Sequence, residues 1–327
     1  MGRPLRKKLV GQGAYYHLYN RVGGPIGELP FNDVDKEKAF HMLEDLSEYF
    51  LLEFISVVWM GSHFHLICYV PGELPSLEDV AKRHNRYYGE KKMELNPRYN
   101  REKCEDVAKQ MVDISEFMRV FQQKYTRYIN RVHKRQGSLW GDRFKSSVLE
   151  GSREALWNGV KYVELNPVRA RISDDPADYR FCTWGRYNGS GTHPFHKNFC
   201  KHMRAVAEQH EGKELSDEAV YTEFRGELAR IRAWEADQDR KLAEDGKTKA
   251  AMAAEKARTK GDSMALRFLR RTRYWTDGAV IGSKVFVQEV GCMFEEREGI
   301  MKKQLSRGAV PGGGILHGLK RLRSEPA

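Results

Sequence analysis

The sequence predicts an α+β protein whose helices cover one face of an open antiparallel sheet. Residues 51–59 and 63–70 are two apolar runs separated by the short turn Met60-Gly61-Ser62, which is typical of a β-hairpin. Residues 14–22 alternate and are rich in aromatic side chains, which indicates a further strand. Segments with helical periodicity lie between and after these strands, and this mixed order with antiparallel neighbours is typical of an α+β layer.

The first half of the chain adds two helices and one polar segment to these strands. Glycines around Pro25 mark a loop, and a helical segment then runs from Asp35 to about Phe50, with apolar side chains three or four positions apart. Residues 76–88 are also expected to be helical. Residues 89–110 are polar and charged, so we expect an insertion or a mobile loop there.

The elements that follow complete a predicted domain of residues 1–195. A long basic helix is expected over 113–135, and a strand or hairpin over 138–149. Residues 152–165 are expected to form another helix, which ends at Asn166-Pro167 because the residue before a proline disfavours helical backbone.

The composition changes after about residue 200. Residues 204–260 are rich in Ala, Glu, Lys, Arg and Gln, which predicts long exposed helices. We expect a small helical element over 268–298 and a loose, basic, glycine-containing tail over 307–327. The segment 196–327 is therefore predicted to be a mostly helical accessory region with a flexible end.

Length and composition exclude several classes of protein. The chain has 327 residues, of which 40% are hydrophobic and 31% charged, which fits neither a membrane protein nor wholesale disorder. The sequence offers no apolar run long enough to span a bilayer, and the basic N-terminus lacks the apolar stretch of a signal peptide. We expect a cytoplasmic protein without membrane contact. The five scattered cysteines form no CxxC pair, so neither a disulfide framework nor a cysteine-rich zinc site is expected.

Positive charge is concentrated in one segment. The formal net charge is +11, and the stretch from Arg119 to Lys145 holds eight basic residues and one acid, Asp142. Such a stretch predicts a surface for a polyanion such as nucleic acid. A solvated helix face explains the same charges and remains an alternative.

A His-x-His pair lies on the second strand of the predicted hairpin. Residues i and i+2 of a strand face the same side, so His63 and His65 project together while Phe64 points to the other face. Two imidazoles side by side can hold one divalent ion and leave coordination positions for a substrate oxygen. Such pairs also occur by chance.

A tyrosine and an asparagine are spaced one helical turn apart near the end of the last predicted helix. In a helix, the Tyr162 phenol and the Asn166 amide are four positions apart and therefore lie on the same face. A phenol has a pKa of about 10 and is a poor nucleophile at neutral pH, but a nearby cation stabilises the phenolate. The alternative is a tyrosine that packs at a helix end.

In combination these segments resemble a known family. GAYYHLYNRV at 13–22, MGSHFHLICYV at 60–70, KYTRYINRVHKRQGSLWGDRFKSSVL at 124–149 and KYVELNPVRARI at 161–172 occur in the order and approximate spacing of the REP-associated tyrosine transposases, a branch of the single-tyrosine HUH nucleases. The resemblance covers roughly residues 10–190. It implies a ferredoxin-like or RRM-like sheet, and a protein that acts as a monomer or a homodimer.

The resemblance also implies a chemistry. Tyr162 matches the nucleophile that joins to the 5′-phosphate of cut single-stranded DNA, and His63, His65 and Asn166 match the ligands of Mg²⁺ or Mn²⁺. The implied activity is that of a metal-dependent endonuclease and strand transferase that cuts near hairpin-forming DNA. The alternative is a regulator with the same fold that binds nucleic acid without cutting it. His17, on the first strand, is expected to be a structural histidine, and the alternative is that it reaches the metal region.

The basic stretch is the expected contact surface for hairpin DNA, because a strand needs cations for its backbone and aromatic rings for unpaired bases. For Trp140 and Phe144, core packing is an equal alternative. The rival tyrosines of this segment, Tyr125 and Tyr128, have no Asn or Gln four residues later. The side chains expected to contact DNA are Arg119, Lys124, Arg127, Arg131, Lys134, Arg135, Trp140, Arg143 and Lys145.

Overall fold

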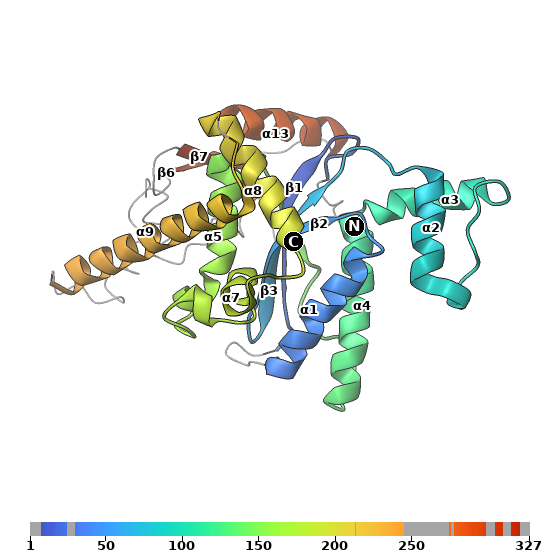
Figure 1. Ribbon diagram of the computed structural model, residues 1–327, viewed down its shortest axis with the longest axis horizontal. Helices are drawn as coiled ribbons and strands as arrows, with labels where there is room; N and C mark the ends of the chain where they lie inside the picture. Colours follow the sequence, from blue (N-terminus) through green and yellow to red (C-terminus); the bar gives the residue numbers. More distant parts are fainter. Residues whose placement is uncertain are drawn as a thin grey trace, which may run out of the picture. The chain divides into compact units, whose positions relative to one another are not determined.

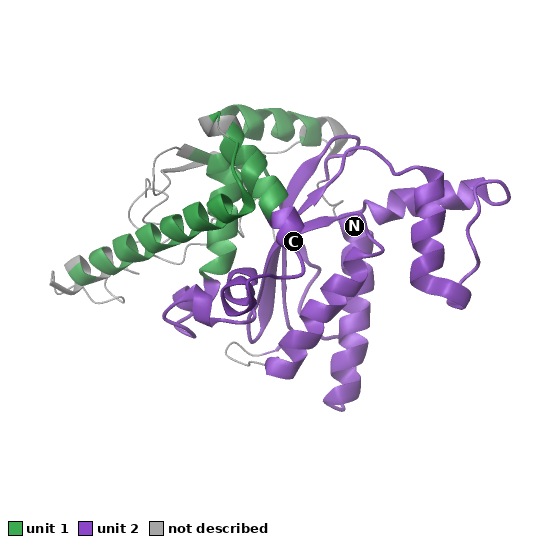
Figure 2. Ribbon diagram, viewed as in Figure 1, with its two compact units in different colours: residues 1–5, 149–165, 200–327 green, residues 6–148, 166–199 purple. Residues whose placement is uncertain are grey.

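The computed structural model divides the chain into two compact units, which Figure 2 colours green and purple. Unit 1 contains Leu149–Leu165 and Cys200–Ala327 together with Met1–Leu5, and unit 2 contains Arg6–Val148 and Asn166–Phe199. The structure describes residues 8–24, 30–212, 214–244, 275, 278–298, 305–309 and 315–320.

Unit 2 is built on an antiparallel sheet with the strand order β2-β3-β1-β4. The predicted hairpin is confirmed: β2 (Glu53–Trp59) and β3 (His63–Val70) pair antiparallel across the short turn, and β1 (Ala14–Arg21) pairs with β3 on its other side. The segment predicted as a strand or hairpin over 138–149 contributes β4 (Lys145–Leu149), whose last residue already belongs to unit 1.

The core of unit 2 lies between this sheet and two helices, α1 (Asp33–Ser47) and α4 (Ile114–Val132), which run side by side in Figure 1. Sheet residues of one parity pack their rings against α4: Phe54 lies 5.0 Å from Phe117, and Phe64 lies 5.9 Å from Phe121 between ring centroids. All four rings are buried. The predicted α+β class is confirmed, since helices and an antiparallel sheet share one core.

Local side chains fix where α1 begins. Asn32 is the N-cap, its side chain accepts from the backbone N–H of Asp35, and the Asp35 carboxylate accepts in return from the Asn32 N–H at 3.0 Å. This capping box satisfies two N–H groups that a helix start leaves unpaired. The sequence placed Asp35 at the opening of the helix, and it is instead the third helical residue.

The prediction of a mobile loop over 89–110 is wrong for half of that segment. A short 3-10 turn, η1 (Gly89–Lys91), follows α2 (Leu77–Tyr88), and Arg101–Met111 form α3, which packs on α2. The helix buries Cys104, Val107, Ala108 and Met111. These positions have the spacing of a helix face, but three of the side chains are small or polarisable, so the charged residues around them hide the pattern.

Unit 2 also contains three short helical segments and the first turn of a longer helix. They are α6 (Asn166–Arg169), η3 (Pro176–Asp178), α7 (Thr183–Ser190), and residues 196–199 of α8 (His196–Glu211). The Thr183 hydroxyl ties α7 to β2, because it accepts from the Val57 N–H at 2.6 Å.

Unit 1 joins a short internal segment to the C-terminal part of the chain. Its helices are η2 (Arg153–Trp157), a π-type turn that leads into α5 (Asn158–Glu164), and then the rest of α8, α9 (Asp217–Glu244) and α13 (Lys284–Glu298). Its strands have the order β5-β7-β6: β5 (Gly278–Gly282), β6 (Leu305–Ala309) and β7 (Ile315–Lys320).

Three predictions for the C-terminal region need correction. Within the segment expected to be helical over 268–298, residues 278–282 form the strand β5 ahead of the helix α13, and the tail expected to be loose contains β6 and β7, which pair antiparallel. The helix α9 is not simply exposed, because Val220, Phe224, Leu228 and Ile231 form a buried stripe. Each of these strands is only five or six residues long and contains at least one glycine, which weakens the alternation typical of a strand. Residues 245–260 and the Gly312–Gly314 run lie outside the described residues.

The domain boundary differs from the predicted one in one important respect. The predicted break at 195/196 lies close to the observed break between Phe199 and Cys200, but the segment Leu149–Leu165 belongs to the C-terminal unit. The helix with Tyr162 is therefore grouped with α9 rather than with the histidine-bearing sheet. None of the helices among the described residues combines the length and apolarity needed to span a bilayer.

Candidate functional site

The sheet of unit 2 presents a row of histidines on the face opposite to the aromatic core. In the register of β1 and β3, Tyr19 lies opposite His65 and Arg21 lies opposite His63. Strand alternation places these four side chains and His17 on one face. The His63 and His65 rings are 5.4 Å apart between centroids and nearly perpendicular, so the predicted side-by-side pair is present.

Both imidazoles of the pair are held in the neutral form. Burial, helped by the positive charge of Arg21, lowers the pKa of His63 to about 4. Burial also lowers the pKa of His65 well below its usual range, and His17 and His63 act in the same direction. Neutral imidazole is the form that binds a metal ion. These residues therefore fit a divalent cation at neutral pH without the loss of a proton.

These lowered pKa values predict that the protein loses stability in mild acid. In the unfolded chain a histidine has a pKa of about 6.5, so as the pH falls below that value the unfolded state takes up protons before the folded state does. Stability is then greatest above pH ~6.5 and falls toward pH ~4, and buried His193, whose pKa is lowered to about 3, adds to the effect. We expect the urea midpoint to drop between pH 7.5 and pH 5. The His63→Ala variant should show a smaller drop in the urea midpoint than the wild-type protein. An equal midpoint of the wild-type protein at both pH values would contradict the prediction.

Asn166 belongs to the same unit as the histidines but not to the helix of Tyr162. The helix α5 ends at Glu164, and Asn166 begins the short helix α6. Pro167 follows directly and has no N–H to continue the earlier helix. The predicted end of the helix is thus correct. Leu165 lies between the two helices with helical backbone angles (φ −83°, ψ 0°), so the shared face expected for Tyr162 and Asn166 stays a prediction. The role of Asn166 as a metal ligand stays a prediction.

Tyr162 lies on α5 in unit 1 and is partly exposed. Its ring stacks on the ring of Trp275 with 5.8 Å between centroids and 29° between planes. Trp275 is buried, so it gives the phenol a fixed support. Sequence reasoning missed Trp275, since it is more than one hundred positions away and no nearby pattern marks it.

The rival Tyr125 is excluded as a nucleophile by its position. It is fully buried in the core of unit 2, and its hydroxyl donates to the backbone carbonyl of Asp35 at 3.1 Å. Burial raises its pKa far above the usual value, with Asp35 acting in the same direction. Tyr128, one turn further on α4, is half-buried, and its pKa is also raised by burial and by Asp35.

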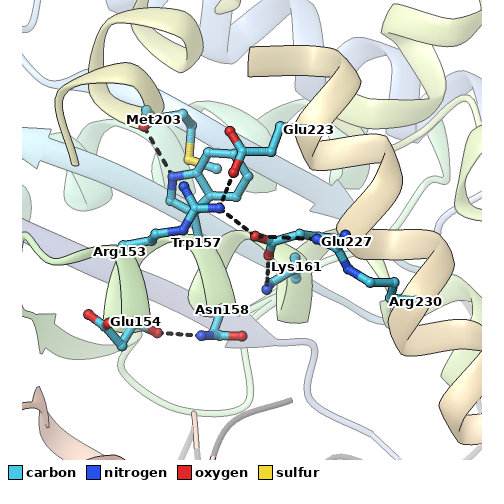
Figure 3. Close-up of polar contacts among 9 residues, drawn as sticks. All are labelled: Arg153, Glu154, Trp157, Asn158, Lys161, Met203, Glu223, Glu227 and Arg230. Atoms are coloured by element: carbon cyan, nitrogen blue, oxygen red, sulfur yellow. Dashed lines mark hydrogen bonds and ion pairs between the residues drawn. The ribbon is translucent and has the colours of Figure 1, made fainter. Parts of the chain in front are cut away.

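An ion cluster holds the helical segment before Tyr162 against α9 (Figure 3). Arg153 and Lys161 both pair with Glu227, and Arg153 also pairs with Glu223. The Arg153–Glu227 pair is 2.7 Å long, and only 3% of the Lys161 side chain is exposed. The adjacent Trp157 indole donates to the Met203 carbonyl at 3.1 Å. Lys161 directly precedes Tyr162, so these contacts fix the backbone that carries the phenol.

Removal of the central acid of this cluster should destabilise unit 1. Glu227→Gln leaves Lys161 and Arg153 buried with one fewer counter-charge, and the loss of one partner from a buried pair costs about 3–5 kcal/mol. The control is Glu218→Gln, an exposed acid in the first turn of α9, which should cost less than about 1 kcal/mol. Chemical unfolding measures both. If both variants lowered the free energy of unfolding by the same amount, the structural role of Glu227 would be contradicted.

The predicted DNA-contact residues all lie in unit 2 and divide into three groups. Arg119 and Lys124 are engaged with carboxylates: Arg119 pairs with Glu116, and Lys124 lies 3.1 Å from Asp45. Trp140 is half-buried and packs 5.6 Å from the Phe64 ring, so core packing accounts for most of its surface. The remaining six are basic and exposed: Arg127, Arg131, Lys134, Arg135, Arg143 and Lys145.

Comparisons with known proteins add one finding. No family model matches the chain, and no curated protein matches it. A solved structure is similar to it. That structure is described as a REP-associated tyrosine transposase bound to a REP hairpin; it is 15% identical, has a TM-score of 0.39, and the match covers 60% of this chain and 90% of that chain. A likeness at this level assigns no residue and no activity, so the function proposed below depends on the side chains of this protein.

Proposed function

We propose that this protein is a metal-dependent endonuclease and strand transferase for single-stranded DNA, with a 5′-phosphotyrosine intermediate. The observation that carries the proposal is the pair of neutral imidazoles, His63 and His65, side by side on one face of the sheet. The resemblance of four ordered motifs to the REP-associated tyrosine transposases supports the same chemistry and supplies Tyr162 as the nucleophile.

In this proposal each residue has a defined task. His63 and His65 hold Mg²⁺ or Mn²⁺ with Asn166 as a third ligand, and the bound ion supplies charge stabilisation at a phosphate oxygen. The Tyr162 hydroxyl loses its proton and attacks the phosphorus, a Tyr–O–P bond forms, and the bond to the 3′ oxygen breaks. The 3′ oxygen takes up a proton and leaves as a hydroxyl. The reverse attack by a 3′-hydroxyl rejoins DNA without a nucleotide cofactor.

The proposal sets a requirement on the two units. Tyr162 belongs to unit 1, and the metal ligands belong to unit 2. The phenol therefore has to reach the histidine face during the reaction. The stack on Trp275 and the ion cluster with α9 give the phenol a defined place within its own unit.

The exposed basic residues around the end of α4 supply the surface for the strand. Arg127 and Arg131 are one turn apart on α4, and Lys134 and Arg135 follow directly. Cations in such a row bind the phosphate backbone without sequence preference, and the affinity then falls steeply with salt. A hairpin with a short single-stranded foot is the expected substrate.

The direct test incubates the full chain with a 5′-labelled or 3′-labelled oligonucleotide that carries a hairpin and a single-stranded flank. With Mg²⁺ or Mn²⁺, the label on the 3′ side of the cut should move to an SDS-stable protein band, and the other product should end in a 3′-hydroxyl. EDTA should abolish both products. If the protein binds the hairpin but forms no adduct with any divalent ion, a regulator that does not cut DNA replaces the proposal.

A further inference from the structure

A third histidine contacts the proposed metal pair from the first strand. His17 Nε2 lies 2.9 Å from His65 Nδ1, and both side chains are buried. In the β1–β3 register His17 lies opposite Ile67, so it reaches His65 diagonally across the face. Tyr19 completes the group: its ring stacks on His17 at 5.0 Å and on His65 at 5.6 Å between centroids.

The 2.9 Å contact sets a condition on the protons. In its neutral form each imidazole has one N–H, and one of the two nitrogens in this contact then donates while the other accepts. If His17 donated, His65 Nδ1 would be the acceptor and the proton of His65 would lie on Nε2. If His65 Nδ1 donates, its Nε2 carries a lone pair and is the nitrogen that can bind a cation.

We propose that His17 is a positioning residue that accepts a hydrogen bond from His65 Nδ1–H and so holds His65 in the tautomer whose Nε2 binds the divalent cation. This inference rests on the proposed function, since it concerns the metal ligands named there. The acceptor nitrogen of His17 is then Nε2, and its own proton lies on Nδ1.

His63 has a similar arrangement with a different partner. Its Nδ1 lies 3.3 Å from the Ser62 hydroxyl oxygen, which can accept from an Nδ1–H. In both rings of the pair the Nδ1 edge thus contacts a protein group, and Nε2 is the nitrogen for the cation. Contacts of this kind orient metal-binding histidines, and their removal typically lowers metal affinity about 10–100-fold.

The test compares two variants of the full chain, because a purely structural His17 would not make Mn²⁺ affinity depend on a hydrogen-bond acceptor at this position. His17→Gln keeps an oxygen that accepts from His65 Nδ1–H, whereas His17→Phe keeps a ring in the stack and removes the acceptor. Calorimetry with Mn²⁺ should show a dissociation constant about 10–100-fold higher for His17→Phe and within a few-fold of wild type for His17→Gln. Thermal unfolding shows whether each variant is folded.

Nitrogen NMR of the wild-type imidazoles gives a readout that does not need a variant to fold. We expect the His65 signal to show a proton on Nδ1 before metal is added, and that of His17 to show an unprotonated Nε2. A His65 proton on Nε2 overturns the inference, as does Mn²⁺ affinity unchanged in folded His17→Phe. If His63→Ala loses Mn²⁺ binding in that case, the proposed metal site still stands. No Mn²⁺ binding by the wild-type protein overturns both.

Discussion

Tyr162→Phe is expected to abolish the covalent DNA adduct and to lower strand cleavage by at least about 10³-fold. The nucleophile is the phenolic oxygen, and no other group restores the Tyr–O–P bond when it is absent. The substitution leaves the ring that stacks on Trp275, so the fold of unit 1 should be kept. Hairpin binding should also be kept within a few-fold, because the exposed cations lie in unit 2. The measurement is adduct formation with a labelled hairpin in Mn²⁺, beside a binding titration.

The matched control for this variant is Tyr128→Phe. Tyr128 is a half-buried tyrosine on the basic helix α4 and the strongest rival outside the core. Its substitution should leave adduct formation close to wild type. The opposite pattern, an adduct in Tyr162→Phe and none in Tyr128→Phe, would move the nucleophile to α4.

His63→Ala is expected to produce the second-largest effect, with loss of Mn²⁺ binding and a decrease of about 10²–10³-fold in adduct formation. The ligand set loses one of two adjacent imidazoles, and the charge stabilisation at the attacked phosphate is lost with the cation. His63 is half-buried, whereas His65 is buried in the stack with His17 and Tyr19. His63→Ala should therefore disturb the fold less than His65→Ala, so that a loss of activity in this variant reports on metal binding.

A suitable control is His41→Ala. The side chain of His41 is 60% exposed on α1, and it lies near Glu37 and Glu44. Its removal should change neither the Mn²⁺ affinity nor the yield of adduct. If the two variants behave alike, the cation binds elsewhere or takes no part in cleavage. A high Mn²⁺ concentration should rescue His63→Ala in part, since one imidazole remains.

The sheet and its histidine face could be predicted from the sequence because the alternation of side chains along a strand depends only on neighbouring residues. The turn Met60-Gly61-Ser62 between two apolar runs determines the β2–β3 hairpin, and the alternation of β3 then places His63 and His65 together. The same alternation places Phe64 on the opposite face. These features depend on neighbours within about ten residues.

The features that were missed depend on contacts between distant segments. Trp275 meets Tyr162, and Glu227 meets Lys161, across separations that no local pattern reveals. The group 149–165 was assigned to the N-terminal domain because its motif follows that domain in the chain. Its side chains Arg153, Trp157 and Lys161 instead contact side chains of α9 within unit 1. His17 was expected to be structural, with reach to the metal region as the alternative, and the diagonal contact across β1 and β3 shows that it meets His65.

Mass spectrometry of the trapped adduct identifies the nucleophile, because trypsin releases Tyr162 on a peptide of its own. Trypsin cuts after Lys161 and after Arg169, and the peptide between these sites holds Tyr162 as its one tyrosine. If the enzyme fails to cut beside the modified residue, the longer peptide that starts after Arg153 still contains no second tyrosine. We expect a nucleotide 5′-phosphate to be attached to this peptide in Mn²⁺ and to be absent in EDTA. Attachment to a peptide with another tyrosine, or no covalent attachment in any divalent metal, would contradict this expectation.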